Sequence, residues 1–275
     1  MNAVFKNKDR ENLLLFLGAG FSHDAGLPLQ NNFFEHVRNK SVRSLLDPYE
    51  YAGLTAAQMI SSVGSTNNKD PNMETAFSML DYIYYMKNDD FKLAHLWYDD
   101  FIPANNSQLG VEKLREQFLK ALEKIFMYNR VGAYINHDLY YYFFEELLKK
   151  FNVYIITTNY DLVCESVFHK MIGVNALYFP VITYDEWPAN YYPVPLLKLH
   201  GSIDWKETKY DLPNIIPPTW SKHFERKSKY NRIWSEAENA ITISDKIIFI
   251  GYSMPETDTH TIFNKIRITK FFIET

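Results

Sequence analysis

Four short polar clusters in the sequence each directly follow an apolar run. They are GAGFS after Leu17, TTNYD after Ile156, HGSIDW after Leu199 and GYSMPETDTH after Ile250. Glycine lets the backbone approach an anion, amide and carboxylate groups bind ribose hydroxyls, and histidine exchanges protons near neutral pH. Parallel sheets bind ligands at the carboxyl ends of their strands, so four such clusters indicate one shared site.

The first cluster has the composition of a phosphate-binding turn. Gly18 and Gly20 would let backbone N–H groups approach a phosphate, and the helix that follows would offer its positive end. It is not a Walker loop, because no Gly-Lys-Ser/Thr follows, and His23 stands where the dinucleotide fingerprint has its third glycine. An ordinary glycine turn after a strand remains the alternative.

The second and third clusters each allow two interpretations. Asn159 and Asp161 could hold ribose hydroxyls or a carboxamide, or they could form a turn that caps the next helix. His200, followed by Gly201, could reach a substrate as a base, or it could be a structural histidine whose hydrogen bonds are satisfied.

The fourth cluster places Gly251 and Ser253 at another strand end, with Asp258 and His260 shortly after. The polar side chains there could meet an adenosine ribose, or they could cap a helix that begins after Pro255.

The elements that would position these clusters can be read from the apolar pattern. Apolar runs without alternation predict buried parallel strands at 13–17, 153–157, 196–199 and 246–250, with weaker candidates at 176–182 and 270–274. Apolar stripes predict helices at 111–128 and around Leu139, Phe143 and Leu147. The fold class predicted is α/β, a Rossmann-like open and mostly parallel sheet, in a single domain over residues 1–275 with a helical insertion at about 40–150.

Composition excludes several classes of protein. The chain has 275 residues, 47% of them hydrophobic, and a formal net charge of -4 without a long basic run, so direct nucleic-acid binding is not expected. A single cysteine, Cys164, excludes an intrachain disulfide and a four-cysteine zinc cage. The apolar run at 13–17 is too short for a signal peptide or a membrane span, so we expect a cytoplasmic protein.

Taken in order, the four motifs resemble those of the sirtuin-like family, NAD-consuming enzymes on a Rossmann-type sheet. GAGFSHDAGLP resembles the opening GAG-x-S-x-x-x-G-[IL]-P, and TTNYD resembles T-Q-N-[IV]-D. KLHGS is similar to the segment with the catalytic histidine, and FIGYS to the late G-[TY]-S strand end. The four motifs span nearly the whole chain.

The chain also departs from the protein-deacylating members of that family. Those members have Asp-Phe-Arg after the opening motif, whereas LQN follows Pro28 here, and they carry a four-cysteine zinc module that this chain lacks. The segments PPTW and GYSMPETDTH resemble instead the sirtuin-like NAD-degrading effectors of bacterial anti-phage systems. The resemblance therefore implies NAD as a substrate and no metal.

The resemblance also implies roles for individual residues. His200 would be the base acting on a ribose hydroxyl or on water, and Asn159 would hold the nicotinamide-side ribose or a water. Asp161 would meet the carboxamide or help to order that pocket. The other expected NAD-binding residues are Gly18, Ala19, Gly20 and Ser22 at the pyrophosphate, and Gly251, Ser253, Asp258 and His260 on the phosphate or adenosine side.

The activity implied by the resemblance is NAD+ hydrolysis to nicotinamide and ADP-ribose by a NAD-depleting defence effector. Such an enzyme needs control, so we expect a homo-oligomer and a separate sensor chain, by analogy a hexameric ATPase or a short Argonaute protein. Two alternatives stay open at this point: a nucleotide-binding regulatory module without catalysis, and a NAD-dependent protein deacylase. Whether the product would be linear or cyclic ADP-ribose is also open.

Overall fold

The structure, a computed structural model, divides into two compact units. It describes residues 9–62, 72–87, 110–128, 137–171, 174–178, 192–206, 208, 211–216 and 228–253. The sheet unit comprises Met1–Leu27, Asn129–Ser202 and Lys222–Thr275, and the helical unit comprises Pro28–Tyr128 and Ile203–Ser221. No helix in the described ranges is long and apolar enough to cross a membrane.

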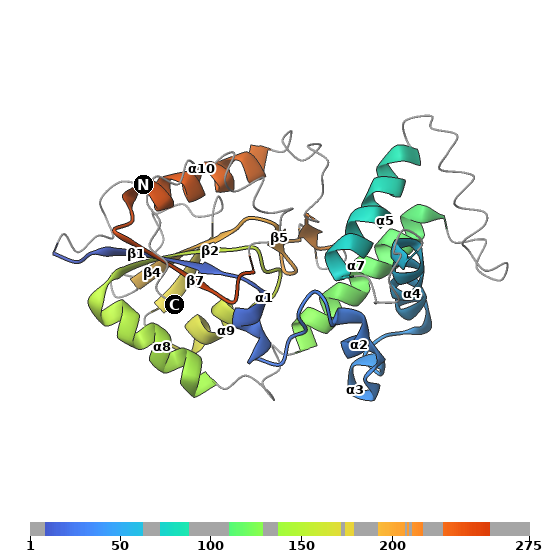
Figure 1. The fold of residues 1–275 in the computed structure, drawn as a ribbon, viewed down its shortest axis with the longest axis horizontal. Coiled ribbons are helices and arrows are strands. Elements are labelled where there is room, and N and C mark those ends of the chain that lie inside the picture. The colour runs from blue at the N-terminus through green and yellow to red at the C-terminus, as the bar shows by residue number, and fades with distance from the viewer. Residues whose placement is uncertain are drawn as a thin grey trace. The chain divides into compact units, whose positions relative to one another are not determined.

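The sheet unit contains an open parallel sheet. Across the described residues the strand order is β3 (Val174–Tyr178), β4 (Tyr192–Lys198), β2 (Asn152–Thr157), β1 (Asn12–Leu17) and β7 (Lys246–Ile250). Every neighbouring pair in this sheet is parallel (Figure 1). The predicted Rossmann-like α/β class is therefore confirmed.

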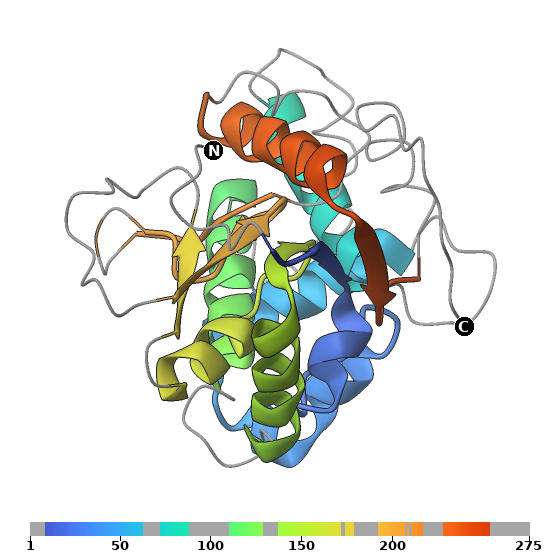
Figure 2. The same ribbon diagram turned by 90° about the vertical axis from the view of Figure 1, so that its left-hand side faces the viewer.

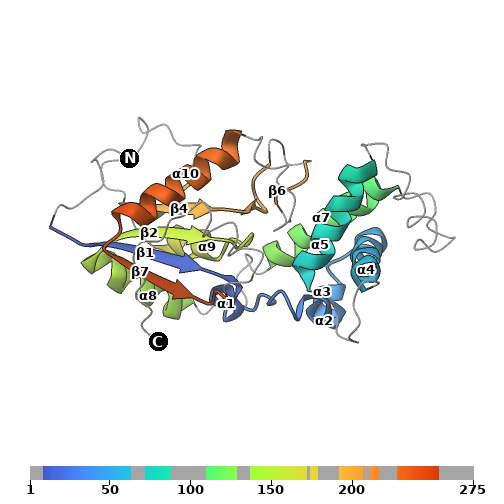
Figure 3. The same ribbon diagram turned by 45° about the horizontal axis from the view of Figure 1, so that its top comes forward.

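Helices cover both faces of this sheet, and this explains the unbroken apolar runs of its strands. Helix α10 (Ser228–Ile243) lies on one face, and α8 (His137–Lys150) and α9 (Val163–Lys170) lie on the other (Figure 2 and Figure 3). The five apolar residues of β1 are at most 1% exposed. A strand that is covered on both faces has no polar side, so the sequence shows no alternation.

The predicted strands are largely confirmed. The runs at 13–17, 153–157, 196–199 and 246–250 correspond to β1, β2, β4 and β7, and β4 begins earlier than predicted. The weaker candidate at 176–182 overlaps β3, which begins at Val174 and whose described part ends at Tyr178. The candidate at 270–274 lies outside the described residues.

The predicted helix at 139–147 is confirmed as α8, but its buried face differs from the predicted one. Leu139 is 54% exposed, whereas Tyr140 and Phe144 are buried. The Tyr140 hydroxyl donates a hydrogen bond to the Phe21 carbonyl at 2.5 Å, and both Tyr140 and Phe144 pack edge-on against the Phe21 ring. These contacts turn the aromatic side of α8 toward the short helix α1 (Ala19–His23), which follows β1.

The helical unit is built from helices before residue 129. They are α2 (Phe33–Arg38), α3 (Lys40–Arg43), α4 (Pro48–Ser62), α5 (Met73–Lys87) and α7 (Val111–Tyr128), and the unit also holds the short strand β6 (Asn214–Ile215). Helix α7 has the predicted bounds. The predicted insertion at 40–150 overlaps this unit, whereas α8 belongs to the sheet unit. The description of residues 1–275 as one domain stays a prediction.

Helix α4 packs closely against α7 because a glycine stands at their contact. A Cβ atom at Gly53 would lie 2.8 Å from the Gln117 Cβ and 2.9 Å from the Phe118 backbone nitrogen. Phe118 in turn packs against Phe77 of α5 with the two rings tilted and their centroids 5.4 Å apart. A small residue therefore lets three helices share one core.

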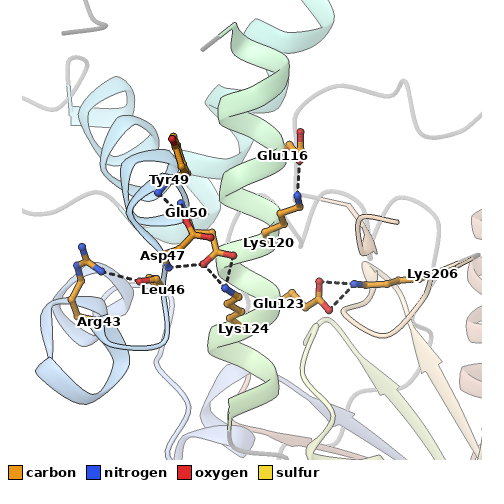
Figure 4. A network of polar contacts seen from close by, with 10 residues as sticks. All are labelled: Arg43, Leu46, Asp47, Tyr49, Glu50, Glu116, Lys120, Glu123, Lys124 and Lys206. Atoms are coloured by element: carbon orange, nitrogen blue, oxygen red, sulfur yellow. Dashed lines mark hydrogen bonds and ion pairs between the residues drawn. The ribbon is translucent and has the colours of Figure 1, made fainter. Parts of the chain in front are cut away.

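A polar network fixes the beginning of α4 and ties it to α7 (Figure 4). The Asp47 carboxylate accepts hydrogen bonds from the backbone N–H groups of Tyr49 and Glu50, and the Glu50 carboxylate accepts from the Asp47 N–H at 2.9 Å. This reciprocal pattern is a capping box. Lys124 of α7 reaches the Glu50 carboxylate at 2.7 Å. The bond from the Glu50 N–H, followed by that from Tyr49 and the charge of Lys124, holds the pKa of Asp47 below its ordinary value.

Candidate functional site

The four strands that carry the polar clusters end level with one another. In the register of the sheet Leu17 pairs with Thr157 on one side and with Ile250 on the other, and Thr157 pairs with Lys198. Gly18, Thr158, Leu199 and Gly251 therefore begin the next row, beyond the carboxyl ends of β1, β2, β4 and β7. The four clusters are spread over more than 230 residues of the sequence, and they thus lie together at the carboxyl-terminal edge of the sheet. Strand β1 is next to the middle strand, β2.

The glycines of the β1 and β7 ends allow two backbone turns to touch. The Gly18 N–H donates to the Ile250 carbonyl at 3.0 Å, and the Gly20 N–H donates to the Gly251 carbonyl at 2.9 Å. A Cβ atom would lie 2.5 Å from the Gly251 oxygen at Gly18, and 2.7 Å from the Gly251 Cα at Gly20. Gly251 itself has φ +62°, and a Cβ there would lie 2.1 Å from the Phe21 nitrogen.

This contact bears on the predicted pyrophosphate cradle. The N–H groups of Gly18 and Gly20 donate to backbone carbonyls here, so their donation to a phosphate would require those two bonds to be exchanged. Ala19, which begins α1, is half-buried, and Ser22 is buried with its hydroxyl toward the end of β2. The role of this turn in holding a phosphate stays a prediction.

Asn159 joins the end of β2 to the end of β1. Its Nδ2 donates to the Gly18 carbonyl at 2.9 Å and to the Ser22 hydroxyl at 3.0 Å. Its backbone N–H donates to the Thr157 hydroxyl at 3.0 Å, and that hydroxyl donates to the Leu17 carbonyl at 2.9 Å. Both amide hydrogens of Asn159 are thus used inside the protein. Its Oδ1 atom is the part of the amide that can accept a hydrogen bond from a ribose hydroxyl or a water.

Asp161 caps the helix that follows it. Its Oδ1 accepts a hydrogen bond from the Val163 N–H at 3.0 Å at the beginning of α9, and the side chain is buried. The structure therefore shows the capping alternative for this residue, while a contact with a carboxamide stays a prediction.

Lys198, the last residue of β4, is a member of this edge that the sequence analysis missed. It is 1% exposed, yet it carries an ammonium group. Its Nζ donates to the Asp161 and Tyr160 carbonyls, to the Ser202 hydroxyl at 2.8 Å and to the Glu165 carboxylate at 2.8 Å. The signal was present in PLLKLHGS, where one lysine closes an apolar strand, and buried lysines are rare unless they are paired.

His200 follows this lysine at the sheet edge. The Leu199 N–H donates to the Thr157 carbonyl at 2.9 Å, which extends the β2–β4 pairing by one residue and fixes the backbone before His200. After it, Gly201 has φ +84°, a left-handed turn that glycine adopts without strain, and leads into the short strand β5 (Gly201–Ser202). The His200 side chain is buried, with its ring centroid 6.3 Å from that of Tyr160.

Comparison with known proteins finds a family that part of this chain resembles. A search of the curated proteins finds none that matches the chain. The family model of the SIR2-like domain matches residues 153–270. This part of the chain is therefore similar to a SIR2-like domain. Domains of this kind use NAD as a substrate, so the match fits a NAD-related enzymatic activity.

The SIR2-like match begins within β2 and includes the clusters with Asn159, His200 and Gly251. The β1 turn with Gly18 lies before the matched residues, but sheet register and hydrogen bonds join it to them. Ser253, also inside the match, is exposed just after β7. Asp258 and His260 lie outside the described residues.

The lone cysteine of the SIR2-like domain is unsuited to nucleophilic chemistry. Cys164 in α9 is buried, and burial, followed by the charges of Glu165 and Asp161, raises the pKa of its thiol well above the ordinary value. A thiol that stays protonated is a poor nucleophile. The described part of the chain contains no group of three or more His, Cys, Asp or Glu residues that could hold a metal ion.

Proposed function

We propose that this chain is a NAD+ glycohydrolase that releases nicotinamide and ADP-ribose. The observation that carries the proposal is the placement of Asn159 and His200 just beyond the neighbouring strands β2 and β4, beside the glycine turn of β1. A ligand at this edge could reach an amide, a base and a turn rich in backbone N–H groups at the same time.

The reaction needs little from the protein at the leaving group. The C1–N bond of the nicotinamide riboside breaks, and its electron pair neutralises the cationic ring nitrogen, so no acid is required. The transition state resembles an oxocarbenium ion. A water oxygen then bonds to C1, and its proton passes to His200 as general base. The Asn159 Oδ1 holds that water or a ribose hydroxyl.

The rest of the dinucleotide is assigned by the sequence resemblance, and the order of the strands is compatible with that assignment. The turn from Gly18 to Ser22 lies beside the pyrophosphate, with Gly251 and Ser253 on the adenosine side. Asp161 borders the nicotinamide pocket through the loop that it caps. Asp258 and His260 are assigned to the same side of the proposed site by the sequence resemblance alone.

The proposed biological role is depletion of cellular NAD in defence against phage. The resemblance of GYSMPETDTH and PPTW to effector segments supports it, as does the absence of the Asp-Phe-Arg and zinc cysteines that mark deacylases. Such a cytoplasmic enzyme would be switched on by self-assembly or by a separate sensor chain, because unregulated hydrolysis would harm the cell.

The test is chromatography of the products that the purified protein forms from NAD. Release of nicotinamide and ADP-ribose without any peptide is expected, at first with the chain alone over a range of concentrations and then with the product of a neighbouring gene. We expect His200→Ala and Asn159→Ala each to lower turnover by about a hundredfold or more, the usual scale for the loss of a general base or a positioning group.

Matched controls are available on the same unit. His169 and Asn239 are exposed on α9 and α10, and His169→Ala and Asn239→Ala should retain wild-type turnover. Wild-type turnover in His200→Ala or Asn159→Ala would contradict the assignment.

The same assay separates the alternatives. NAD binding without release of nicotinamide would favour a nucleotide-binding regulatory module. Formation of O-acetyl-ADP-ribose only with an acetylated peptide would favour a deacylase.

A further inference from the structure

Lys198 links the segments that carry the two candidate catalytic residues. It precedes His200 by two residues, and its ammonium group contacts residues that follow Asn159. The contacts come from three segments: the loop after β2, helix α9 and strand β5. No other lysine in the described ranges is among the largest fully buried side chains.

The hydrogen bonds of Lys198 account for its whole donor capacity. An ammonium group has three N–H bonds, and four acceptors surround this one. The carbonyl of Tyr160 is the most distant at 3.4 Å, so it shares a donor with its neighbour Asp161. The remaining two donors meet the Ser202 hydroxyl and the Glu165 carboxylate, both at 2.8 Å. The group is thus held at once by the loop after β2, helix α9 and strand β5.

Stability alone does not explain a charged pair in this place. Removing an ion pair from water is costly, and apolar or neutral residues of similar volume often serve a fold equally well. What the ion pair adds is a defined geometry of the groups around it. An ammonium in a dry site fixes its acceptors at defined angles, which an apolar side chain cannot do.

We propose that Lys198 is a positioning residue that clamps the Asn159 loop to the His200 loop and sets the distance between the two candidate catalytic groups. The catalytic consequence rests on the proposed NAD hydrolysis, but the clamp itself does not. Lys198 does not touch the substrate. It acts through the carbonyls of Tyr160 and Asp161 and through the Ser202 hydroxyl.

The decisive variant is the double substitution Lys198→Met with Glu165→Gln. Removal of the lysine alone would leave a carboxylate in a poorly hydrated place and could unfold the protein, whereas the double variant removes both charges and keeps both volumes. We expect it to melt near the wild-type temperature. Its amide hydrogens in residues 158–165 and 198–204 should exchange about tenfold faster or more, while those of β1 and β2 stay protected.

Kinetics give the second measurement. Because a displacement of about 1 Å can cost up to a hundredfold in rate, we expect kcat for NAD cleavage to fall about tenfold or more with KM little changed. A merely structural role would lower the folded fraction and raise exchange throughout the sheet unit. Ser202→Ala, which removes one of the four contacts, should give a smaller change of the same kind.

The matched control is Lys206→Met with Glu123→Gln. These residues also form a lysine–glutamate pair, with both carboxylate oxygens 2.6 Å from the ammonium, and it bonds to neither loop (Figure 4). In this control variant, the amide hydrogen exchange of residues 158–165 and 198–204 should equal that of the wild type. Its kcat for NAD cleavage should also be unchanged.

The two proposals fail in different ways. Wild-type exchange in both loops of the Lys198→Met, Glu165→Gln variant would overturn the clamp, whatever the activity. Loosened loops with unchanged kcat would overturn its role in positioning. If the wild-type protein does not cleave NAD at all, the proposed function fails, and the exchange measurement still decides whether the clamp exists.

Discussion

The sheet unit and the helical unit each pair a lysine with a glutamate, but the two lysines lie in opposite surroundings. Lys198 is 1% exposed and its partner Glu165 is 16% exposed, whereas Lys124 is 44% exposed and its partner Glu50 is 4% exposed. In the helical unit the carboxylate is buried and already accepts a backbone hydrogen bond in the capping box. In the sheet unit the ammonium group itself is the centre of the contacts. A lysine–glutamate pair therefore supports the cap at the beginning of a helix in one unit, and it holds the segments after two strands together in the other.

The largest difference should come from removing each lysine in turn. We expect Lys198→Met to lower the free energy of unfolding by about 3 kcal/mol, because it leaves the Glu165 carboxylate without its counter-charge in a poorly hydrated place. Lys124→Met should cost about 1 kcal/mol or less, because water reaches that lysine. Urea denaturation of both variants measures the two losses. Equal losses would mean that burial does not distinguish the pairs.

Glycine substitutions should give the next largest contrast. Gly251→Ala must place a side chain at φ +62° and against the backbone of Gly20 and Phe21, so we expect a loss of about 2 kcal/mol or more. In Gly53→Ala of α4 the added Cβ would meet its nearest atom at 2.8 Å instead of 2.1 Å, and no positive φ is involved. The substitution also gains about 1 kcal/mol of helix propensity. Its net loss should therefore be the smaller one. Thermal denaturation of the two variants tests this order, and a more stable Gly251→Ala would contradict the close contact of the two turns.

The smallest of the three effects concerns the cap of α4. Asp47→Ala should cost about 1 kcal/mol at neutral pH. Since the folded protein holds the pKa of Asp47 below 3.8, the charged cap stabilises the fold above that pH and loses its contribution as the pH falls further. The difference between wild type and Asp47→Ala, measured by urea denaturation, should therefore shrink in acid. A difference that stays constant down to pH 2 would contradict a charged cap.

The parts of the fold that burial determines could be predicted from the sequence. Runs such as 13–17 are apolar throughout, and only a strand covered on both faces accounts for them. The face of α8 could not be predicted, because YYYFF offers apolar side chains in every direction and only the position of Phe21 selects Tyr140 and Phe144. Periodicity fails where every position of a helix can be buried.

The candidate site also has residues that could be predicted from the sequence and residues that could not. Asn159, His200 and Gly251 could be selected because four clusters of polar residues and glycines each follow an apolar run, and parallel strands bring such ends together. Lys198 was not selected by that reasoning, since it is the last residue of β4 and precedes the polar cluster that begins at His200. Its role depends on Glu165 and Ser202, which only the folded chain brings together. The shared edge was predictable, and the bonds that hold it together were not.

The parallel pairing of β1 with β7 has a consequence for how the protein is made. Asn12 and Asp245 exchange hydrogen bonds across 233 positions of the chain, and the contact between Gly18 and Gly251 closes just beyond the opposite end of the same strand pair. A ribosome delivers the chain from its N-terminus, so the first glycine turn leaves the ribosome long before its partner has been synthesised. A nascent chain therefore holds an incomplete sheet until β7 has been synthesised, and the proposed NAD site can close only after Gly251 has left the ribosome.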